Sequence, residues 1–360
     1  MANGFRMITR CVWLSFLGAA AAACLSPPGP VEEIDRGHGL EEQRALITRL
    51  FNASDTRQPL DPAVHSTRFS EKAVSAAWWG FDPADSTVFL QAALNSGADT
   101  ILVPRMAGPW ISRALTVRSR TTLLLEEGVE LLAKPGAFRP RSGAFLNIND
   151  VEDVIISGYG AVIRMRKADY TAPPYEKGEW RHTIQICGGT RVTVRGLTAE
   201  TSGGDGVYLG RGGTSLTNTA IVLKDLVLKN HHRQAVSVIT AVDLLIENTE
   251  MSGTSGTAPS AGIDFEPNLP DEPLRGCRLR RCLIRNNAGA GFQGYFRAQT
   301  QASPPFDITL EDSTVYGNLA GVFLAGFDKG AHGRLTFTGN RIYGLRFIPP
   351  ISQRFIFTER

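Results

Sequence analysis

The sequence predicts an all-β solenoid, a fold in which each short repeat forms one coil of the chain. From Thr100 to about Tyr343, short runs of β-branched and apolar residues alternate with Gly, Asn and Asp turns. These runs recur at an irregular period of 23 to 33 residues. Because one such repeat cannot bury its own apolar face, a period of this length favours coils stacked into a continuous core.

Two interleaved sets of runs carry the repeat. The runs of the first set begin at Val192, Ile221, Leu244, Cys277, Ile308 and Leu335. The runs of the second set begin at Gly206, Ala235, Gly262, Gly291 and Gly321. The asparagines Asn230, Asn287 and Asn318 suit the tight corners of a β-solenoid. A leucine-rich repeat is excluded, because its Leu-xx-Leu-x-Leu-xx-Asn signature is absent.

Residues 1–24 have the features of an export signal. Arg6 and Arg10 precede an apolar run that is too short and too Ala-rich for a transmembrane span. The segment ends Ala21-Ala22-Ala23-Cys24, which is similar to a bacterial lipobox with Cys24 as the lipidated residue. We therefore expect a bacterial protein that is periplasmic, surface-anchored through a lipid on Cys24, or secreted after ordinary cleavage.

Two helices are predicted before the repeats. Leu46, Ile47 and Leu50 have helical spacing within the segment from Leu40 to Phe51. A second helix is expected near Pro83–Asn95, with Asp82 as its N-cap residue.

The expected layout has five parts. Residues 25–39 form a Pro-rich linker after the leader, and residues 40–99 form a helical capping segment. Residues 100–345 form the solenoid, and residues 346–360 form a C-terminal tail.

Composition and cysteine spacing limit which partners and cofactors are expected. The net charge of the 360 residues is +3, which falls to about +1 without Arg6 and Arg10 of the leader, so nucleic acid is not the expected partner. Cys187, Cys277 and Cys282 are odd in number and irregular in spacing, which predicts buried free thiols. No CxxC or HExxH motif occurs, so the sequence predicts no metal site of the zinc type.

Paired carboxylates occur in the run from Ala261 to Asn268. In a β-strand, Asp264 and Glu266 share one face, with their Cα atoms about 6.6 Å apart. Two carboxylates this close raise the pKa of one of them, which produces a proton donor. The same pattern also fits a solvated acidic strand face.

The coils resemble those of the right-handed parallel β-helices of the pectin-lyase-like superfamily. The resemblance covers about residues 74–345 and rests on the entry segment Trp79-Gly80-Phe81-Asp82 and on coils such as Val154-Ile155-Ile156-Ser157-Gly158 and Ile246-Glu247-Asn248. It implies a single-stranded right-handed parallel β-helix with an N-terminal helical cap. It leaves the reaction open, because the superfamily includes lyases, inverting glycosidases, epimerases, esterases and phage tailspikes.

In this fold, outward residues of successive coils stack in columns. Aligning the second set of runs places six residues in one outward column: Gln185, Tyr208, Ser237, Asp264, Gln293 and Phe323. Their inward neighbours are all apolar, as a filled core requires: Ile184, Val207, Val236, Ile263, Phe292 and Val322. Glu266 and Tyr295 extend the outward set by one position. We expect a groove along this column.

The turns that enter these strands carry further candidate side chains. Trp180 and Tyr208 could stack on sugar rings or could pack a corner. Arg181 and Arg233 could bind carboxylate or sulfate groups, or could pair with Asp264 and Glu266.

Histidines and one further aspartate lie in the same turns. His182, His231 and His232 are half of the six histidines of the chain and are predicted at one edge of the groove. Adjacent His231 and His232 cannot both face the groove if the chain is extended there. Asp205 follows two glycines, which could simply shape a turn.

The leading expectation is an exported glycoside hydrolase acting on a polysaccharide or oligosaccharide. Its catalytic carboxylates would be Asp264, Glu266 and Asp205. Its substrate-binding residues would be Trp180, Arg181, His182, Gln185, Tyr208, His231, His232, Arg233, Gln293 and Tyr295. The resemblance to iota-carrageenases of this fold supports the pair, because they place an acid and a base one residue apart on a strand, in the opposite order of residue types.

Two alternatives remain open. A lyase or epimerase acting on uronates would need a neutraliser and a base, which Arg233 with His232 or Tyr208 could supply. Calcium held by Asp205 and Asp264 would belong to that alternative; the leading expectation requires no cofactor. A non-catalytic glycan-binding or structural β-helix would instead scatter its acids over several faces.

Overall fold

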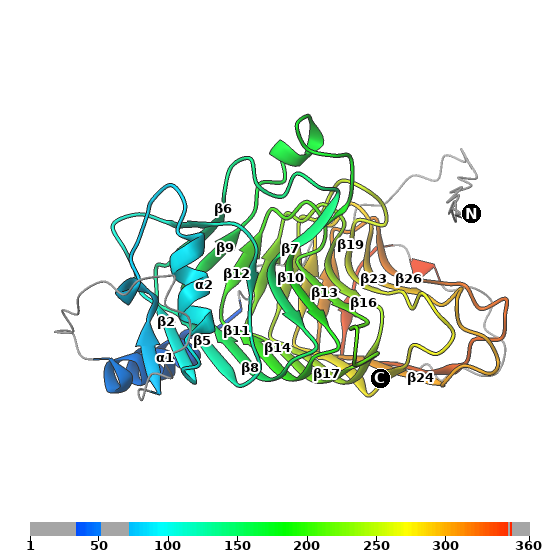
Figure 1. Ribbon diagram of the computed structural model, residues 1–360. Coiled ribbons are helices and arrows are strands. Elements are labelled where there is room, and N and C mark those ends of the chain that lie inside the picture. The colour runs from blue at the N-terminus through cyan, green and yellow to red at the C-terminus, as the bar shows by residue number, and fades with distance from the viewer. Residues whose placement is uncertain (1–33, 52–71, 345, 348–360) are drawn as a thin grey trace.

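The computed structural model describes residues 34–51, 72–344 and 346–347 (Figure 1). The export signal with Cys24, most of the linker and residues 348–360 lie outside the described residues. The described chain winds into a right-handed parallel β-helix built from three parallel sheets, which we call sheets A, B and C. The predicted fold class is confirmed.

The three sheets run side by side along the solenoid, and every strand pair within them is parallel. Sheet A contains β1 (Ala73–Ser75), β2 (Thr100–Val103), β5 (Thr121–Leu125), β8 (Glu152–Ser157), β11 (Thr190–Arg195), β14 (Asn218–Lys224), β17 (Ala241–Glu247), β20 (Leu274–Arg275), β21 (Cys277–Arg280), β24 (Phe306–Glu311) and β27 (Gly333–Thr338). Sheet B contains β3 (Trp110–Ser112), β6 (Glu130–Ala133), β9 (Val162–Arg164), β12 (Thr198–Glu200), β15 (Val227–Lys229), β18 (Glu250–Ser252), β22 (Leu283–Arg285), β25 (Thr314–Tyr316) and β28 (Arg341–Ile342). Sheet C contains β4 (Leu115–Thr116), β7 (Ser142–Asn149), β10 (Trp180–Cys187), β13 (Val207–Gly210), β16 (Gln234–Val238), β19 (Ala261–Phe265), β23 (Ala290–Tyr295), β26 (Ala320–Ala325) and β29 (Arg346–Phe347).

The register of sheet C is the one that the sequence predicts. Gln185 pairs with Tyr208, and the pairing continues through Ser237, Asp264, Gln293 and Phe323. The inward stack is confirmed as well, because the side chains of Val207, Val236, Ile263, Phe292 and Val322 are all buried. A slip of one residue would have turned Asp264 into the core, so this register fixes which side chains face outward.

Asparagine side chains stabilise the corners between sheets B and C. Asn318 accepts hydrogen bonds from both the backbone and the side-chain amide of Asn287, and Asn287 in turn accepts one from the backbone of Thr254. Stacked amides on successive coils thus satisfy buried backbone groups at the turn. This confirms the expectation for Asn287 and Asn318.

The helix α2 (Thr87–Asn95) packs against the first coil and covers the N-terminal end of the solenoid (Figure 1). The prediction placed its start four residues too early. Asp82 is not the N-cap: its carboxylate accepts the backbone N–H of Ala84, and Ser86 holds the N-cap position. A local Asx turn therefore competes with the helix for these residues.

The helix α1 (Gly37–Leu50) confirms the first predicted helix but docks differently from the expected apolar face. Gln43 is its buried residue, whereas Leu46 and Ile47 are half-buried. The Gln43 amide donates to the carbonyls of Leu125 and Tyr159 and accepts from the Ser157 hydroxyl. The buried Gln43 amide thus joins α1 to the side of the solenoid.

The cysteine prediction is confirmed, because Cys187, Cys277 and Cys282 are all buried free thiols. No helix in the described part of the chain is long and apolar enough to cross a membrane.

Candidate active site

The middle of the outward column on sheet C is covered rather than open. Ser237 and Asp264 have no exposed surface, and Gln293 is 9% exposed. Gln185 and Tyr208, nearer the N-terminal end, are partly exposed, and Gln185 donates to the Asn149 side chain. The outward face of the sheet therefore has a polar layer of side chains lying over its central strands.

Asp264 lies at the centre of this layer. Its Oδ2 accepts hydrogen bonds from Gln234 Nε2 at 3.0 Å and Gln293 Nε2 at 3.1 Å, while Oδ1 has no hydrogen-bond partner. Burial and the nearby Glu266 carboxylate raise the pKa of Asp264 well above its ordinary range, although Arg233 and the two amides oppose the shift. Asp264 therefore keeps its proton to a higher pH than an ordinary aspartate does.

Arg233 connects the carboxylates around Asp264. Its Nη2 donates to Glu266 Oε2 at 3.1 Å, its Nη1 donates to Gln234 Oε1 at 3.1 Å, and its Nε lies 3.7 Å from Glu179 Oε1. Burial would lower the pKa of Arg233, but the surrounding carboxylates raise it overall. The carboxylates responsible are those of Asp205, Glu266, Asp264 and Glu179. We call Arg233 and these four residues the Arg233 cluster.

Asp205 belongs to the cluster through Gln234. Its Oδ1 accepts the backbone N–H of Gln234, whose side chain donates to Asp264. Its Oδ2 lies 3.2 Å from His182 Nδ1, which accepts the backbone N–H of Asp205 at 3.1 Å. The imidazole of His182 stacks on Tyr208 at 4.6 Å between ring centroids. Asp205 and Asp264 are therefore on the same side of the solenoid, as predicted, but both are fully buried.

The adjacent histidines His231 and His232 face different surroundings. His231 is fully buried, its Nδ1 lies 2.8 Å from Ser202 Oγ, and burial lowers its pKa to about 3. His232 is half-buried, and its Nε2 lies 2.9 Å from Thr257 Oγ1. Burial lowers the pKa of His232 as well, which favours a neutral imidazole. Of these two histidines only His232 is available to a ligand, so His231 has a structural role.

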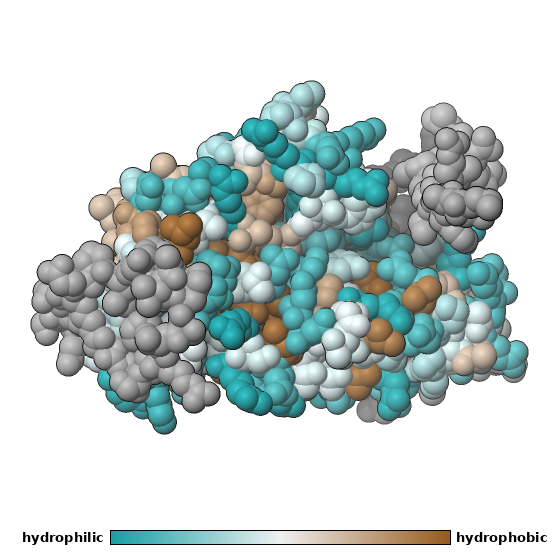
Figure 2. Space-filling view, viewed as in Figure 1, coloured by the Kyte–Doolittle hydropathy of each residue, from teal (hydrophilic) through white to brown (hydrophobic). Residues whose placement is uncertain are grey.

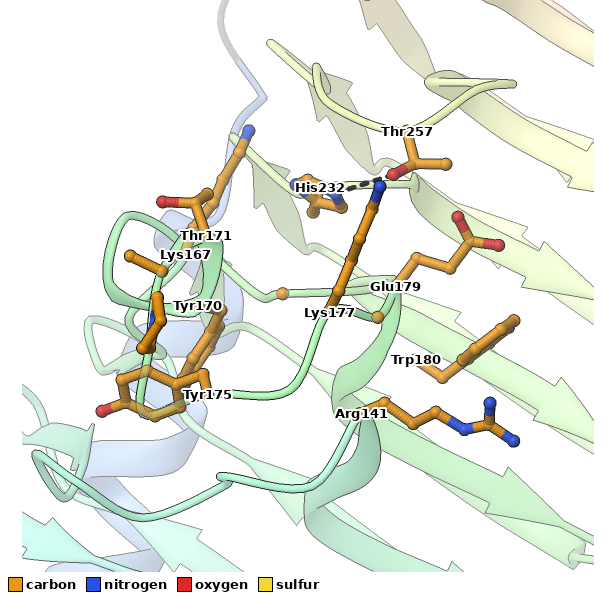
Figure 3. A pocket seen from close by; sticks show the side chains of 14 residues that line it. Arg141, Lys167, Tyr170, Thr171, Tyr175, Lys177, Glu179, Trp180, His232 and Thr257 are labelled. Atoms are coloured by element: carbon orange, nitrogen blue, oxygen red, sulfur yellow. Dashed lines mark hydrogen bonds between the residues drawn. The ribbon is translucent and has the colours of Figure 1, made fainter.

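A pocket of about 980 Å³ opens beside the Arg233 cluster, at the side of sheet C where strands such as β10 begin (Figure 3). One wall is the segment 165–179 between β9 and β10, which projects from the solenoid at the top of Figure 1 and is largely hydrophilic in Figure 2. Trp180 and His232 are the predicted site residues that line the pocket, and Glu179 lines it too. Because Glu179 also lies beside Arg233, it joins the pocket to the cluster.

Arg181 does not face the groove. Its side chain is completely buried and donates to four backbone carbonyls at 2.5 to 3.3 Å. These carbonyls belong to Phe138, Arg139, Glu176 and Gly178. The predicted substrate-binding role is therefore replaced by a structural one, in which Arg181 holds the segment 165–179 against the chain that enters β7.

The remaining predicted residues flank the cluster. Gln293 is a donor to Asp264, and Tyr295 is partly exposed at the end of β23. The residues that the prediction missed are Gln234, Glu179 and Lys177. Gln234 carried no signal, because a polar residue at a strand start is ordinary. Glu179 and Lys177 lie in a segment that does not follow the repeat, so no column alignment reaches them.

The calcium alternative fits the donors poorly. Asp264 Oδ2 is occupied by two amide donors, and a raised pKa favours the neutral acid, which is a weak ligand for a hard cation. In the described ranges, no three His, Cys, Asp or Glu side chains are grouped as a metal site would require.

Comparison with solved structures gives matches to β-helix proteins that act on polysaccharides. A capsular polysaccharide depolymerase, the tailspike of an Acinetobacter baumannii bacteriophage, superimposes with a TM-score of 0.54 at 12% identity over 81% of this chain. A polygalacturonase from Erwinia carotovora matches with a TM-score of 0.52 at 15% identity, over 80% of each chain. An endo-xylogalacturonan hydrolase from Aspergillus tubingensis matches with a TM-score of 0.51 at 12% identity, over 72% of this chain and 82% of that one.

The chain shares the right-handed parallel β-helix fold of these proteins. At these identities the likeness is one of fold, and this chain spans 58% of the length of the tailspike. No family model and no curated protein matches the sequence.

Proposed function

We propose that the protein is a polysaccharide-active glycoside hydrolase whose acid and base are Asp264 and Glu266. The supporting observation is the Arg233 cluster: the buried carboxyl group of Asp264 in β19, with a raised pKa, lies near the partly exposed carboxylate of Glu266, which follows the strand directly and pairs with Arg233. Two carboxyl groups in opposite protonation states are what general acid and base catalysis requires. Structural neighbours that include a polygalacturonase and a depolymerase make a glycan the favoured substrate.

The roles follow from the surroundings of each group. Asp264 holds the proton and would donate it to the glycosidic oxygen. Glu266, with 26% of its side chain exposed, would activate water. A pair in which one carboxyl group donates the proton and the other activates water has the layout of an inverting hydrolase. Asp205 orients Gln234, whose backbone N–H it accepts, and lies 3.2 Å from His182 Nδ1, so its role is to position these two side chains.

Asp264 has no exposed surface, so its proton can reach a substrate only after a neighbouring side chain moves. Arg233 is the group suited to do so, since it is held by side-chain bonds to Glu266 and Gln234 and lies next to Glu179, which lines the pocket. A substrate group that pairs with Arg233 would replace Glu266 and open the way to Asp264.

A panel of polysaccharides tests this function. Incubation with the purified protein should release new reducing ends from one of them without an unsaturated, ultraviolet-absorbing product. Ultraviolet-absorbing product would identify a lyase instead. The absence of cleavage throughout a panel of neutral, uronate-containing and sulfated polysaccharides would favour the non-catalytic alternative.

One observation favours the lyase as second candidate. His232 is half-buried and lines the pocket, burial lowers its pKa, and Lys177 and Arg141 beside it could neutralise a uronate carboxylate. Tyr208 is a poor base by comparison, because burial raises its pKa. Replacing His232 with Gln should abolish cleavage by a lyase and should leave a hydrolase that uses Asp264 and Glu266 active.

We further propose export, supported by the sequence of residues 1–24. Loss of these residues from the mature protein is expected, and Cys24→Ser should release a lipoprotein from membranes. An intact N-terminus on protein isolated from the cytoplasm would contradict export.

A further inference from the structure

We propose that the pocket beside the Arg233 cluster binds an acidic sugar, meaning a glycan ring that carries a carboxylate or sulfate group. This inference rests on the proposed function in taking a glycan as the ligand. It adds the charge of that glycan and the residues that recognise it.

Charge around the pocket is predominantly positive. Arg141, Lys167 and Lys177 line it, and Glu179 is its one carboxylate among the described lining residues. The Glu179 carboxylate is directed at Arg233, 3.7 Å away, so it does not neutralise the other cations. No ion pair within the described part of the chain involves Arg141 or Lys177. These two side chains therefore remain available to an anionic ligand.

An aromatic surface lies next to the free cations. The Trp180 ring is 40% exposed, and the Arg141 guanidinium lies 5.6 Å from its centroid. Figure 3 shows Arg141 beside Trp180 on one side of the pocket and His232 with Thr257 on another. An exposed indole binds the apolar face of a sugar ring, and a neighbouring cation binds an acidic substituent on the same ring.

Hydrogen bonds to the solenoid hold the wall of the pocket in place. Lys167 Nζ donates to the His231 carbonyl at 2.9 Å and to Ser255 Oγ at 3.2 Å, which fastens the segment 165–179 to two later turns. Arg181 fastens the other end of the segment by donating to the carbonyls of Glu176 and Gly178, and it lies 5.1 Å from the Tyr170 ring. A preformed site loses little conformational entropy on binding, which favours a defined ligand over incidental charge.

Four cations near the pocket thus fall into two pairs, one with backbone carbonyl partners and one without an acidic partner. Arg181 and Lys167 are bound to backbone carbonyls, whereas Arg141 and Lys177 project into the pocket without an acidic partner. A segment that only packs on the solenoid would need Arg181 and Lys167, but it would not need Arg141 and Lys177. The free pair identifies the ligand as anionic, and the Arg233 cluster next to it places the acidic ring beside the proposed scissile bond.

Calorimetric binding in the Glu266→Gln background tests the inference, because turnover is then suppressed. The probes are three oligosaccharides of equal length: an oligogalacturonide, a sulfated galacto-oligosaccharide and a neutral galacto-oligosaccharide. We expect one acidic probe to bind at least about tenfold more tightly than the neutral one, with affinity that falls as salt increases. The acidic probe that binds distinguishes carboxylate from sulfate recognition.

Matched variants distinguish binding in the pocket from attraction to the overall charge of the protein. Lys177→Met should weaken binding of the acidic probe about fivefold. Lys329→Met, which removes an exposed lysine from the turn after β26, should leave it unchanged. Trp180→Ala should weaken acidic and neutral probes alike, since stacking does not depend on charge.

Equal affinity for acidic and neutral probes, equal effects of the two lysine variants, or no binding of either acidic probe would overturn the inference. Its failure is distinct from failure of the proposed function. Tight, lysine-dependent binding without cleavage by the wild-type protein would keep the acidic-sugar pocket and refute the hydrolase. Cleavage of a neutral glycan only would keep the hydrolase and refute the acidic-sugar pocket.

Discussion

Two arginines at the same edge of sheet C have opposite surroundings. Arg181 donates its hydrogen bonds to backbone carbonyls of the segments on either side of it, and burial lowers its pKa. Arg233 lies among side-chain carboxylates, and their charge raises its pKa in spite of burial. The first environment is made of fixed dipoles and the second of groups that titrate.

The difference separates a structural region from a candidate functional one. Carbonyl partners cannot change charge, so the region around Arg181 has one state, and it holds the segment 165–179 in place. Carboxylate partners can gain or lose a proton, so the Arg233 cluster can adopt more than one charge state. Clusters of this second kind are concentrated at catalytic sites. Substitutions around Arg181 should therefore change mainly stability, and substitutions in the Arg233 cluster should change mainly activity.

The largest effect is expected in the Arg233 cluster. Glu266→Gln should lower turnover about 10²–10⁴-fold, because it removes one member of the acid–base pair while preserving shape. The matched control is Glu311→Gln, which removes a carboxylate of similar exposure (25% against 26%) paired with an arginine on sheet A. Steady-state kinetics of both variants provides the check. Near-normal turnover in Glu266→Gln would remove it from the mechanism.

The next effect concerns the region around Arg181. Arg181→Met should lower the free energy of unfolding by about 3 kcal/mol or more, because several buried carbonyls lose their donor. Urea denaturation measures this loss, and Arg334→Met at an exposed ion pair serves as control. If Arg181→Met retained full stability and lost only activity, the contrast between the two arginines would be wrong.

The smallest effect is a difference in how stability depends on pH. The pKa of Asp264 is raised in the folded state, so its contribution to stability is fully present below the unfolded pKa of about 3.9 and is lost as pH rises through the folded pKa. Asn at this position does not titrate. The stability of the wild type relative to Asp264→Asn should therefore fall as pH rises above about 4.

Urea denaturation of both proteins across a pH series measures that difference. A difference that stays constant, or that grows with pH, would show that the pKa of Asp264 is not raised.

The sequence predicted the repeat and its register because both depend on local patterns. Apolar residues such as Val236 and Ile263 alternate with polar ones, and the period of two fixes which face each residue joins. That alignment alone placed Asp264 between Ser237 and Gln293, which the structure confirms.

The sequence could not predict what lies over the outward face. Asp264 was expected to be exposed in the groove, yet it has no accessible surface and is bound by the side chains of Gln234 and Gln293. Side-chain coverage depends on residues from neighbouring coils and from their turns, which an alignment of strands does not contain. For the same reason, Arg181 was assigned to the groove although it is buried.

The pocket was missed for a different reason. Its wall is the segment 165–179, an insertion between β9 and β10 with no counterpart in the neighbouring coils, so periodicity gives no position for Lys177 or Glu179. Their places follow from long-range contacts such as those of Lys167 with Ser255.

The central claim is that Asp264 supplies the proton for glycoside hydrolysis, and the pH dependence of kcat/KM for the wild type and Asp264→Asn tests it most directly. The wild type should give a bell-shaped profile whose alkaline limb reports deprotonation of Asp264. The variant should be about 10²–10⁴-fold slower, and its residual activity should lack that limb. A variant that keeps both the rate and the alkaline limb of the wild type would contradict the account.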